Sequence, residues 1–201
     1  LVPWQQLAKR TGAELRLIDL NDRQELDLND AARKIDSRTK VVAIAHVSNV
    51  LGVVNPILKI SAMAHQVGAC LVVDGAQAAP HLPVDVQALD ADFYAFSGHK
   101  MMAPTGIGVL YGKMAWLNRL CPSQFGGEMI DQVVQQTATF KPVPWRFEAG
   151  TPNISGAIAL GAAIDYLSQF GMRAIAEHEQ ELVAYAIPKL LAIDGLTLYG
   201  P

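Results

Sequence analysis

Short runs rich in β-branched and aromatic residues alternate with longer segments of helical periodicity, and this alternation restricts the fold more than any other feature of the chain. The strand candidates are Glu14–Ile18, Val41–Ala45, Cys70–Val73, Phe93–Phe96 and Gly108–Tyr111. The helix candidates between them are Pro3–Thr11, Leu28–Lys34, Pro56–Gln66 and Ala115–Leu120. This order of elements predicts an α/β fold with a mostly parallel central sheet.

The second half of the chain follows a different pattern. Phe125–Phe147 has no clear period and contains two prolines, so we expect a loop excursion with room for a short strand. Ser155–Ser168 is rich in Ala, Gly and Ile and predicts a buried helix, whereas Arg173–Ile187 is amphipathic and more charged. We expect a domain boundary near Gly171, with residues 1–171 in one domain and residues 172–201 forming a linking helix and the start of another.

Charge and cysteine content exclude several classes of partner. Sixteen basic and nineteen acidic residues give a formal net charge of −3 without a run of like charges. We therefore expect neither a nucleic acid nor an anionic membrane as partner. The two cysteines, Cys70 and Cys121, are too far apart for a CxxC redox or zinc pair, which suits a reducing cytoplasm.

The remaining composition predicts a soluble, unexported protein of the cytoplasm. Apolar stretches such as Val41–Ala45 are too short to span a bilayer, and no basic-then-apolar leader opens the sequence. The chain begins at Leu1, not at Met, and it stops where a new strand pattern begins. We therefore expect both ends to be cut.

Polar side chains follow three of the predicted strands, at the point where each strand ends. They are His46, Ser48 and Asn49; Asp74 and Gln77; and Ser97, His99 and Lys100. Since the carboxyl ends of parallel strands meet at one edge of a sheet, we expect these groups to face one crevice. An ionised Asp74 at the end of an apolar strand also predicts a cationic partner.

Each of these residues, taken alone, has an ordinary structural explanation. Asp74 is equally well interpreted as a cap of the next helix. Ser97 and His99 fit turn chemistry and a satisfied buried histidine, and a single Lys100 after a glycine is usually a solvated surface residue. Their combination at three consecutive strand ends is what favours a functional site.

Four motifs give the chain a resemblance to a known family. They are Val73-Asp74-Gly75-Ala76-Gln77, Ser97-Gly98-His99-Lys100, Pro104-Thr105-Gly106-Ile107-Gly108 and Glu148-Ala149-Gly150-Thr151-Pro152-Asn153. The sequence resembles the SufS/CsdA type of cysteine desulfurase, in the class V aminotransferase superfamily of pyridoxal-phosphate enzymes. The likeness runs over essentially all 201 residues. It implies a three-layer sandwich, the large domain of a fold-type I enzyme, incomplete at both ends.

The resemblance implies pyridoxal 5'-phosphate as cofactor and assigns the central chemistry to two residues. Lys100 holds the cofactor as a Schiff base, the internal aldimine, and later moves protons at the substrate Cα. That role requires a lysine with a lowered pKa. Asp74 pairs with the pyridine nitrogen, which keeps the ring protonated and therefore able to stabilise a Cα carbanion.

The same resemblance assigns the remaining contacts with the cofactor. It implies that Gln77 binds the phenolic oxygen and that Ala76 lies against one face of the ring. Ser97 and His99 bind the phosphate. Asn49 lies near the phenolic oxygen and the substrate carboxylate.

Thr151 is implied to reach the phosphate of a neighbouring subunit, so a homodimer with shared active sites is expected. The implied reaction converts L-cysteine to L-alanine and an enzyme-bound persulfide for Fe-S cluster assembly, with a sulfur-acceptor protein as a further partner. By the resemblance, the Gly-Thr phosphate loop and a stacking histidine would precede Leu1. The nucleophilic cysteine and the arginine that binds the substrate carboxylate would follow Pro201.

Neither cysteine of the chain is assigned the role of nucleophile. Cys70 begins a buried strand and is interpreted as a small core residue, and nothing near Cys121 marks it as a thiol of lowered pKa. We therefore expect that the chain alone does not complete the reaction.

Other functions remain open at this point. A selenocysteine lyase, kynureninase or epimerase-like enzyme would share Lys100 and Asp74, and a noncatalytic scaffold would keep the fold alone. A serine hydrolase based on Ser97 and His99 is disfavoured because the two lie on one loop without a G-x-S-x-G elbow. A zinc site is disfavoured because the histidines lack ligand spacing.

Overall fold

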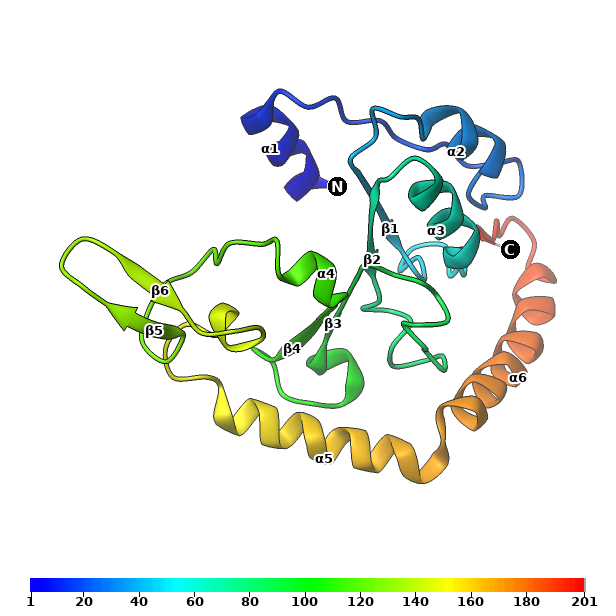
Figure 1. Ribbon diagram of the computed structural model, residues 1–201. Helices are drawn as coiled ribbons and strands as arrows, with labels where there is room; N and C mark the ends of the chain where they lie inside the picture. Colours follow the sequence, from blue (N-terminus) through cyan, green and yellow to red (C-terminus); the bar gives the residue numbers. More distant parts are fainter. Residues whose placement is uncertain (201) are drawn as a thin grey trace.

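A four-stranded sheet forms the centre of the computed structural model, which describes residues 1–200 (Figure 1). The strands are β1 (Val41–Ala45), β2 (Cys70–Asp74), β3 (Phe93–Ser97) and β4 (Gly108–Gly112), in the order β1-β2-β3-β4. β1, β2 and β3 are parallel, and β4 runs antiparallel to β3. The prediction of an α/β fold with a mostly parallel sheet is confirmed.

The helices and smaller elements complete the chain. They are α1 (Val2–Thr11), α2 (Leu28–Lys34), α3 (Ile57–Gln66), the 3-10 turn η1 (Gly98–Met101), α4 (Met114–Leu117), β5 (Ile130–Val133), β6 (Ala138–Phe140), η2 (Trp145–Phe147), α5 (Ile154–Phe170) and α6 (Met172–Leu191). Local capping sets some of these bounds. α2 begins where the Asp27 side chain accepts hydrogen bonds from the N–H groups of Asn29 and Asp30. α1 ends at Gly12, whose left-handed conformation closes the helix.

The main core lies between the sheet and the helices α2 and α3. Its fully or almost fully buried members are Ala31, Val42, Ile57, Ile60, Ala64, Ala69, Leu71, Val73, Ala91 and Tyr94. Removing a large aliphatic side chain of this kind from water contributes about 1.5–3 kcal/mol. The apolar residues whose spacing predicted the strands and helices therefore also form the core that stabilises them.

The predicted strand at Glu14–Ile18 is wrong. These residues form no ladder, and only an isolated bridge joins Leu20 to Leu26. Side chains satisfy part of their backbone instead, since Lys34 Nζ donates to the Leu17 carbonyl at 2.6 Å. The Arg16 guanidinium also holds the segment to Asp36 at 2.9 Å. The β-type sequence pattern thus lacks a partner strand among the described residues.

The excursion between residues 125 and 147 contains more regular structure than the single short strand expected. β5 and β6 pair as an antiparallel hairpin, which projects away from the main sheet in Figure 1. Phe125 packs beside Phe140 at its base, with ring centroids 5.8 Å apart. Alternation across two strands this short is too weak to be recognised in the sequence.

The prediction that Ser155–Ser168 is a buried helix is wrong in its burial. α5 buries only the stripe Gly156, Leu160, Ala163 and Leu167, while Ile158 is 70% exposed. Within this stripe, Leu160 and Ala163 pack with Ala103 and Ile107 near η1. α5 and α6 are joined at Gly171 and form an arc along the outside of the molecule (Figure 1). The apolar composition of a helix indicates that its side chains favour burial. It does not indicate how many of them neighbouring elements bury.

A cluster of charged side chains lies at the sheet edge opposite the carboxyl ends of β1, β2 and β3. Asp92, which precedes β3 and is 3% exposed, accepts from the Leu71 N–H at 2.8 Å and from His65 Nε2 at 2.9 Å. Lys113, after β4, pairs with Asp92 at 3.0 Å and also with Asp90. The cluster joins α3, β2, β3 and the end of β4.

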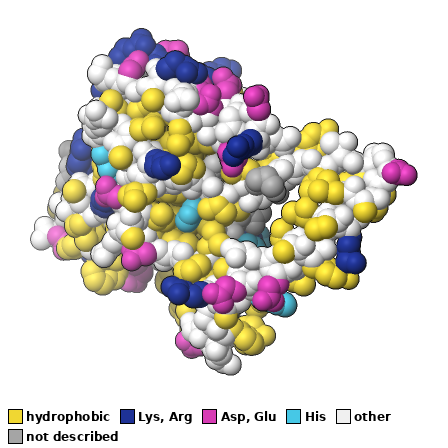
Figure 2. Space-filling model, turned by 90° about the vertical axis from the view of Figure 1, so that its right-hand side faces the viewer, with side chains coloured by type: hydrophobic (Ala, Val, Ile, Leu, Met, Phe, Trp, Pro, Cys, Tyr) yellow, Lys and Arg dark blue, Asp and Glu magenta, His cyan; other side chains and the backbone are white. Residues whose placement is uncertain are grey.

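The face shown in Figure 2 carries charged side chains of both signs, with hydrophobic side chains between them. This mixture agrees with the small net charge of −3. Near the end of the described chain, the Gly200 N–H donates to the Gln24 side chain. No helix among residues 1–200 is both long enough and apolar enough to cross a bilayer.

Candidate active site

The carboxyl ends of β1, β2 and β3 meet at one edge of the sheet, as predicted. In the strand register Ala45 lies opposite Asp74, and Asp74 lies opposite Ala95. Neighbouring strands of a sheet lie about 4.8 Å apart. His46 therefore lies beside the end of β2 on one side, and Ser97, at the end of β3, lies on the other side.

Asp74 is the last residue of β2, and its exposed side chain is held by the turn that follows. Its Oδ1 accepts a hydrogen bond from the Ala76 N–H at 2.9 Å. The Gly75 N–H donates to the Ala95 carbonyl at 2.8 Å, so the turn stays attached to β3. Ala76 and Gln77 continue the turn as half-buried residues.

Lys100 lies in η1, the tight turn that follows β3. The Gly98 N–H donates to the Ile107 carbonyl at 2.9 Å, and the Ala103 N–H donates to the Gly98 carbonyl at 3.0 Å. A Cβ at Gly98 would lie 2.8 Å from Ile107 Cγ2, so only glycine fits. The turn leaves Lys100 half-buried and His99 exposed, just beyond the half-buried Ser97.

The motif around Thr151 is joined to the loop before β4 through Asn153. Asn153 Nδ2 donates to the Gly106 carbonyl at 3.0 Å, while its Oδ1 accepts from the Gly156 N–H and caps α5. Gly106 has a φ of +83°, in the left-handed region that favours glycine. Thr151 itself is exposed. Two motifs 47 residues apart in sequence are thus in contact.

Asn49 lies in the exposed loop after β1. The Ser48 hydroxyl stabilises this loop by accepting from the N–H groups of Val50 and Leu51. No hydrogen bond joins Asn49 to Asp74 or Lys100 among the described residues. The structure places Asp74, Ser97 and Lys100 at the carboxyl edge of the sheet, and Asn49 in the loop that follows β1 at the same edge.

The cation predicted beside Asp74 is not a side chain of the described chain. Asp74 and Lys100 take part in none of the ion pairs among residues 1–200, although carboxylates and ammonium groups elsewhere in the chain pair readily. A carboxylate and an amine at neighbouring strand ends are therefore both available to a bound molecule. The carboxylate suits a protonated ring nitrogen and the amine suits an aldehyde, which are groups of pyridoxal phosphate.

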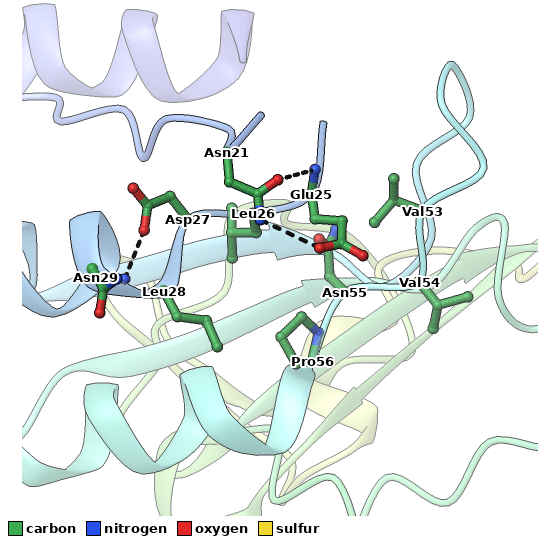
Figure 3. A pocket seen from close by; sticks show the side chains of 10 residues that line it. All are labelled: Asn21, Glu25, Leu26, Asp27, Leu28, Asn29, Val53, Val54, Asn55 and Pro56. Atoms are coloured by element: carbon green, nitrogen blue, oxygen red, sulfur yellow. Dashed lines mark hydrogen bonds between the residues drawn. The ribbon is translucent and has the colours of Figure 1, made fainter. Parts of the chain in front are cut away.

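Two cavities bear on the choice of site, and the larger contains none of Asp74, Ser97, His99 and Lys100. It measures about 510 Å³ and is lined by residues 21, 25–29 and 53–56, which Figure 3 shows in detail. Its lining includes Glu25 and Asp27 but no basic side chain, so it would repel a phosphate. The smaller cavity measures about 180 Å³ and includes Lys100, Met101 and Phe170. We therefore take the smaller cavity as part of the candidate site.

Three of the histidines each bond to different side chains. His46 bonds to Tyr94, His65 to Asp90 and Asp92, and His81 to Glu179. No group of three or more His, Cys, Asp or Glu side chains within residues 1–200 could hold a metal ion.

Sequence reasoning missed Tyr94, which lies beneath the candidate site. Tyr94 is 1% exposed, and its hydroxyl is 3.0 Å from Nδ1 of His46, itself 7% exposed. Burial and the nearby Asp74 charge raise the pKa of Tyr94 far above its usual range, and burial lowers the pKa of His46. The sequence did contain a signal for this pair, because Tyr94 lies within a strand of core residues. A tyrosine hydroxyl that is buried there requires a hydrogen-bond partner.

A polar edge on a mostly parallel sheet, with an unpaired lysine and an unpaired aspartate, suits an α/β protein that binds a ligand at its strand ends. A family model for class-V aminotransferases matches residues 1–201, and the chain belongs to this family. A probable cysteine desulfurase of Halalkalibacterium halodurans is 54% identical over the whole chain. A cysteine desulfurase of Haloferax volcanii is 50% identical over the same 201 residues.

Comparison with solved structures also shows a similarity to a cysteine desulfurase. The apo structure of a cysteine desulfurase from Thermococcus onnurineus covers 100% of this chain with a TM-score of 0.95 and 44% identity. The match takes up 50% of that structure. The chain likewise spans about half the length of the curated relatives it matches, 50% and 47% for the two above.

Proposed function

We propose that the protein is a pyridoxal-phosphate-dependent cysteine desulfurase, to which this chain contributes the lysine-centred part of the active site. The observation that carries the proposal is the pair formed by Asp74 and Lys100, which follow adjacent strands and have no ionic partner among the described residues. The relatives named cysteine desulfurase, at 50–54% identity, support the choice of reaction.

The described residues fit pyridoxal phosphate. Lys100 provides the amine for its aldehyde, Asp74 the carboxylate for its ring nitrogen, and Gln77 an amide for its phenolic oxygen. Ser97 and His99 are donors for the phosphate, and the small Ala76 leaves room against the ring. Asn49 is proposed to lie near the phenolic oxygen and the substrate carboxylate.

When bound, pyridoxal phosphate supplies a protonated pyridine ring that withdraws electron density from the substrate Cα. Asp74 holds the proton on the ring nitrogen. Lys100 Nζ removes the proton from the substrate Cα and returns it, which requires that the amine be neutral for part of the cycle.

The overall reaction breaks the Cβ–S bond of L-cysteine. The sulfur forms a new S–S bond with an enzyme thiol, giving a persulfide, and Cβ gains a proton to give L-alanine. A sulfur-acceptor protein would then remove the persulfide sulfur for Fe-S cluster assembly in the cytoplasm. We further propose a homodimer in which Thr151 binds the phosphate of the neighbouring subunit, with residues 1–171 as the cofactor-binding domain and 172–201 as the link to a second domain.

The two cysteines of the chain do not suit the role of the sulfur-accepting thiol. Cys70 is 5% exposed and begins β2, at the end opposite Asp74, and burial raises its pKa to about 11. Cys121 follows β4 and α4, after the chain has left the sheet at the edge remote from Ser97. A buried thiol of raised pKa is a poor nucleophile.

We therefore expect the isolated 201-residue chain to release no alanine from L-cysteine, even with added pyridoxal phosphate. The measurement is alanine formation by chromatography, alongside the protein expressed from its complete gene as a positive control. Alanine release by the chain at the rate of that control would contradict the expectation.

Replacing Asp74→Asn is expected to lower kcat for L-cysteine by about 100-fold, because a neutral amide does not hold the ring nitrogen protonated. The side chain keeps its size and its acceptor for the Ala76 N–H, so the fold should persist. Steady-state kinetics give the effect. Asp165→Asn, an exposed position on α5, is the matched control and should have normal kcat.

Substrate choice and a noncatalytic role are tested together on the protein expressed from its complete gene. A visible absorbance band that borohydride removes supports the cofactor, while colourless protein unchanged by added pyridoxal phosphate would favour a scaffold. Rates with cysteine, selenocysteine and cysteine sulfinate then separate a desulfurase from a selenocysteine lyase or another class V enzyme. Preference for either alternative substrate would contradict the proposed reaction.

A further inference from the structure

Five contacts hold the turn at Asp74 and the buried pair formed by Tyr94 and His46 in place, and two of them join the turn to the pair. The His46 N–H donates to the Asp74 carbonyl at 2.8 Å, and His46 Nδ1 lies 3.0 Å from the Tyr94 hydroxyl. Gly75 bonds to the Ala95 carbonyl and Ala76 bonds to Asp74 Oδ1. The fifth contact is the packing of the Tyr94 ring on Gly75.

The packing on Gly75 is unusually close. A Cβ at residue 75 would overlap Cε1 and Cζ of the Tyr94 ring. The φ of Gly75 is outside the left-handed region, so the backbone itself would accept an alanine. The tyrosine ring is therefore the reason that this position requires glycine.

The tyrosine is not free to move away. It is 1% exposed, its hydroxyl is held by His46, and the two rings meet edge to face with centroids 6.0 Å apart. Both groups are neutral near pH 7, because burial raises the pKa of Tyr94 and lowers the pKa of His46. A neutral, buried pair gives the turn a fixed support.

We propose that Tyr94, anchored by His46, is a positioning residue that sets the place of the Asp74 carboxylate by supporting the Asp74-Gly75-Ala76 turn. Tyr94 contacts Gly75 and not the reacting atoms, so it acts through Asp74. The inference rests on the proposed function, since the carboxylate it positions is the one that we assign to the cofactor ring.

The first test compares Tyr94→Phe with wild type in the protein expressed from its complete gene. Loss of the hydroxyl leaves His46 Nδ1 without its partner, and we expect the Kd for pyridoxal phosphate to rise roughly tenfold. The absorbance maximum of the bound cofactor, followed against pH, should shift as well. Tyr111→Phe, on the paired position of β4, is the control and should leave both readouts unchanged.

A second test uses Gly75→Ala, Tyr94→Val and the double variant. Gly75→Ala should weaken cofactor binding by more than about tenfold, because its methyl meets the ring. Valine lacks the ring atoms that clash, so the double variant should bind at least about threefold more tightly than Gly75→Ala. Melting temperatures without cofactor should show the same rescue.

Wild-type Kd and spectrum in Tyr94→Phe would overturn the inference, and so would a double variant no better than Gly75→Ala. Failure of the proposed function has a different signature, since wild type itself would then bind no pyridoxal phosphate. In that case the rescue of the melting temperature still decides whether Tyr94 supports the turn.

Discussion

Lys100→Ala is expected to abolish covalent attachment of pyridoxal phosphate and to lower kcat for L-cysteine by at least about 1000-fold. Methyl replaces the only amine that η1 provides at the sheet edge where Asp74 ends β2. Borohydride treatment of wild-type protein should fix the cofactor to the chain, as measured by mass spectrometry. The variant should show no such mass increase.

The fold should survive this change. Lys100 is half-buried and takes part in no ion pair or hydrogen bond among the described residues, so alanine leaves no buried partner unsatisfied. Its neighbour Gly98, which keeps the backbone bonds of η1, is untouched. The melting temperature without cofactor should therefore stay close to that of wild type.

Lys59→Ala is the matched control, because Lys59 is an exposed lysine on α3. It should retain cofactor attachment and normal kcat. If Lys100→Ala kept a borohydride-fixed cofactor while Lys59→Ala lost it, the assignment of Lys100 would be wrong. Equal attachment in both variants would contradict it as well.

Asp92→Ala is expected to lower the free energy of unfolding by about 3–5 kcal/mol, the usual loss when one partner of a buried ion pair is removed. Asp92 is 3% exposed and accepts from the Leu71 N–H, from His65 and from Lys113. Its removal leaves the Leu71 N–H and the Lys113 charge without that acceptor. A fall of about 10 °C in melting temperature should result.

The same cluster predicts how stability depends on pH. Burial opposes ionisation of Asp92, but the bonds from Leu71, His65 and Lys113 outweigh it and lower its pKa below 3.8. Its stabilisation is therefore complete above pH 3.8 and is lost as the pH falls through the lowered pKa. Burial also opposes the charge of Lys113, but Asp90 and Asp92 raise its pKa above 10.5, so its contribution is lost only in strong alkali.

Melting curves of wild type and Asp92→Ala at several pH values test the statement about Asp92. The difference between them should be largest near neutral pH and should shrink below pH 3.8. Asp165→Ala, at an exposed position on α5, is the control and should change the free energy of unfolding by less than about 0.5 kcal/mol. A difference that stays constant into acid would contradict the assigned titration of Asp92.

Local patterns predicted four strands of the sheet because each is bounded by a clear change of composition. β1 has the predicted bounds, and β2, β3 and β4 each end one residue later than expected. The strand at Glu14–Ile18 failed because a strand requires a partner, and its side chains bonded to α2 and its neighbours instead. The prediction that α5 is buried was wrong for a related reason, since the burial of a helix depends on the elements that pack against it.

The sequence by itself determined the order of elements, the polar residues at three strand ends and the likeness to a family. Those features are local, because periodicity and motifs depend only on residues that are close in the sequence. Only the tertiary structure decided which groups are paired and which remain free. Asp92 is bonded to His65 and Lys113 at one edge of the sheet, whereas Asp74 and Lys100 stay unpaired at the other. The close approach of Tyr94 to Gly75 is also a tertiary result, since it joins residues from adjacent strands whose contact no local pattern encodes.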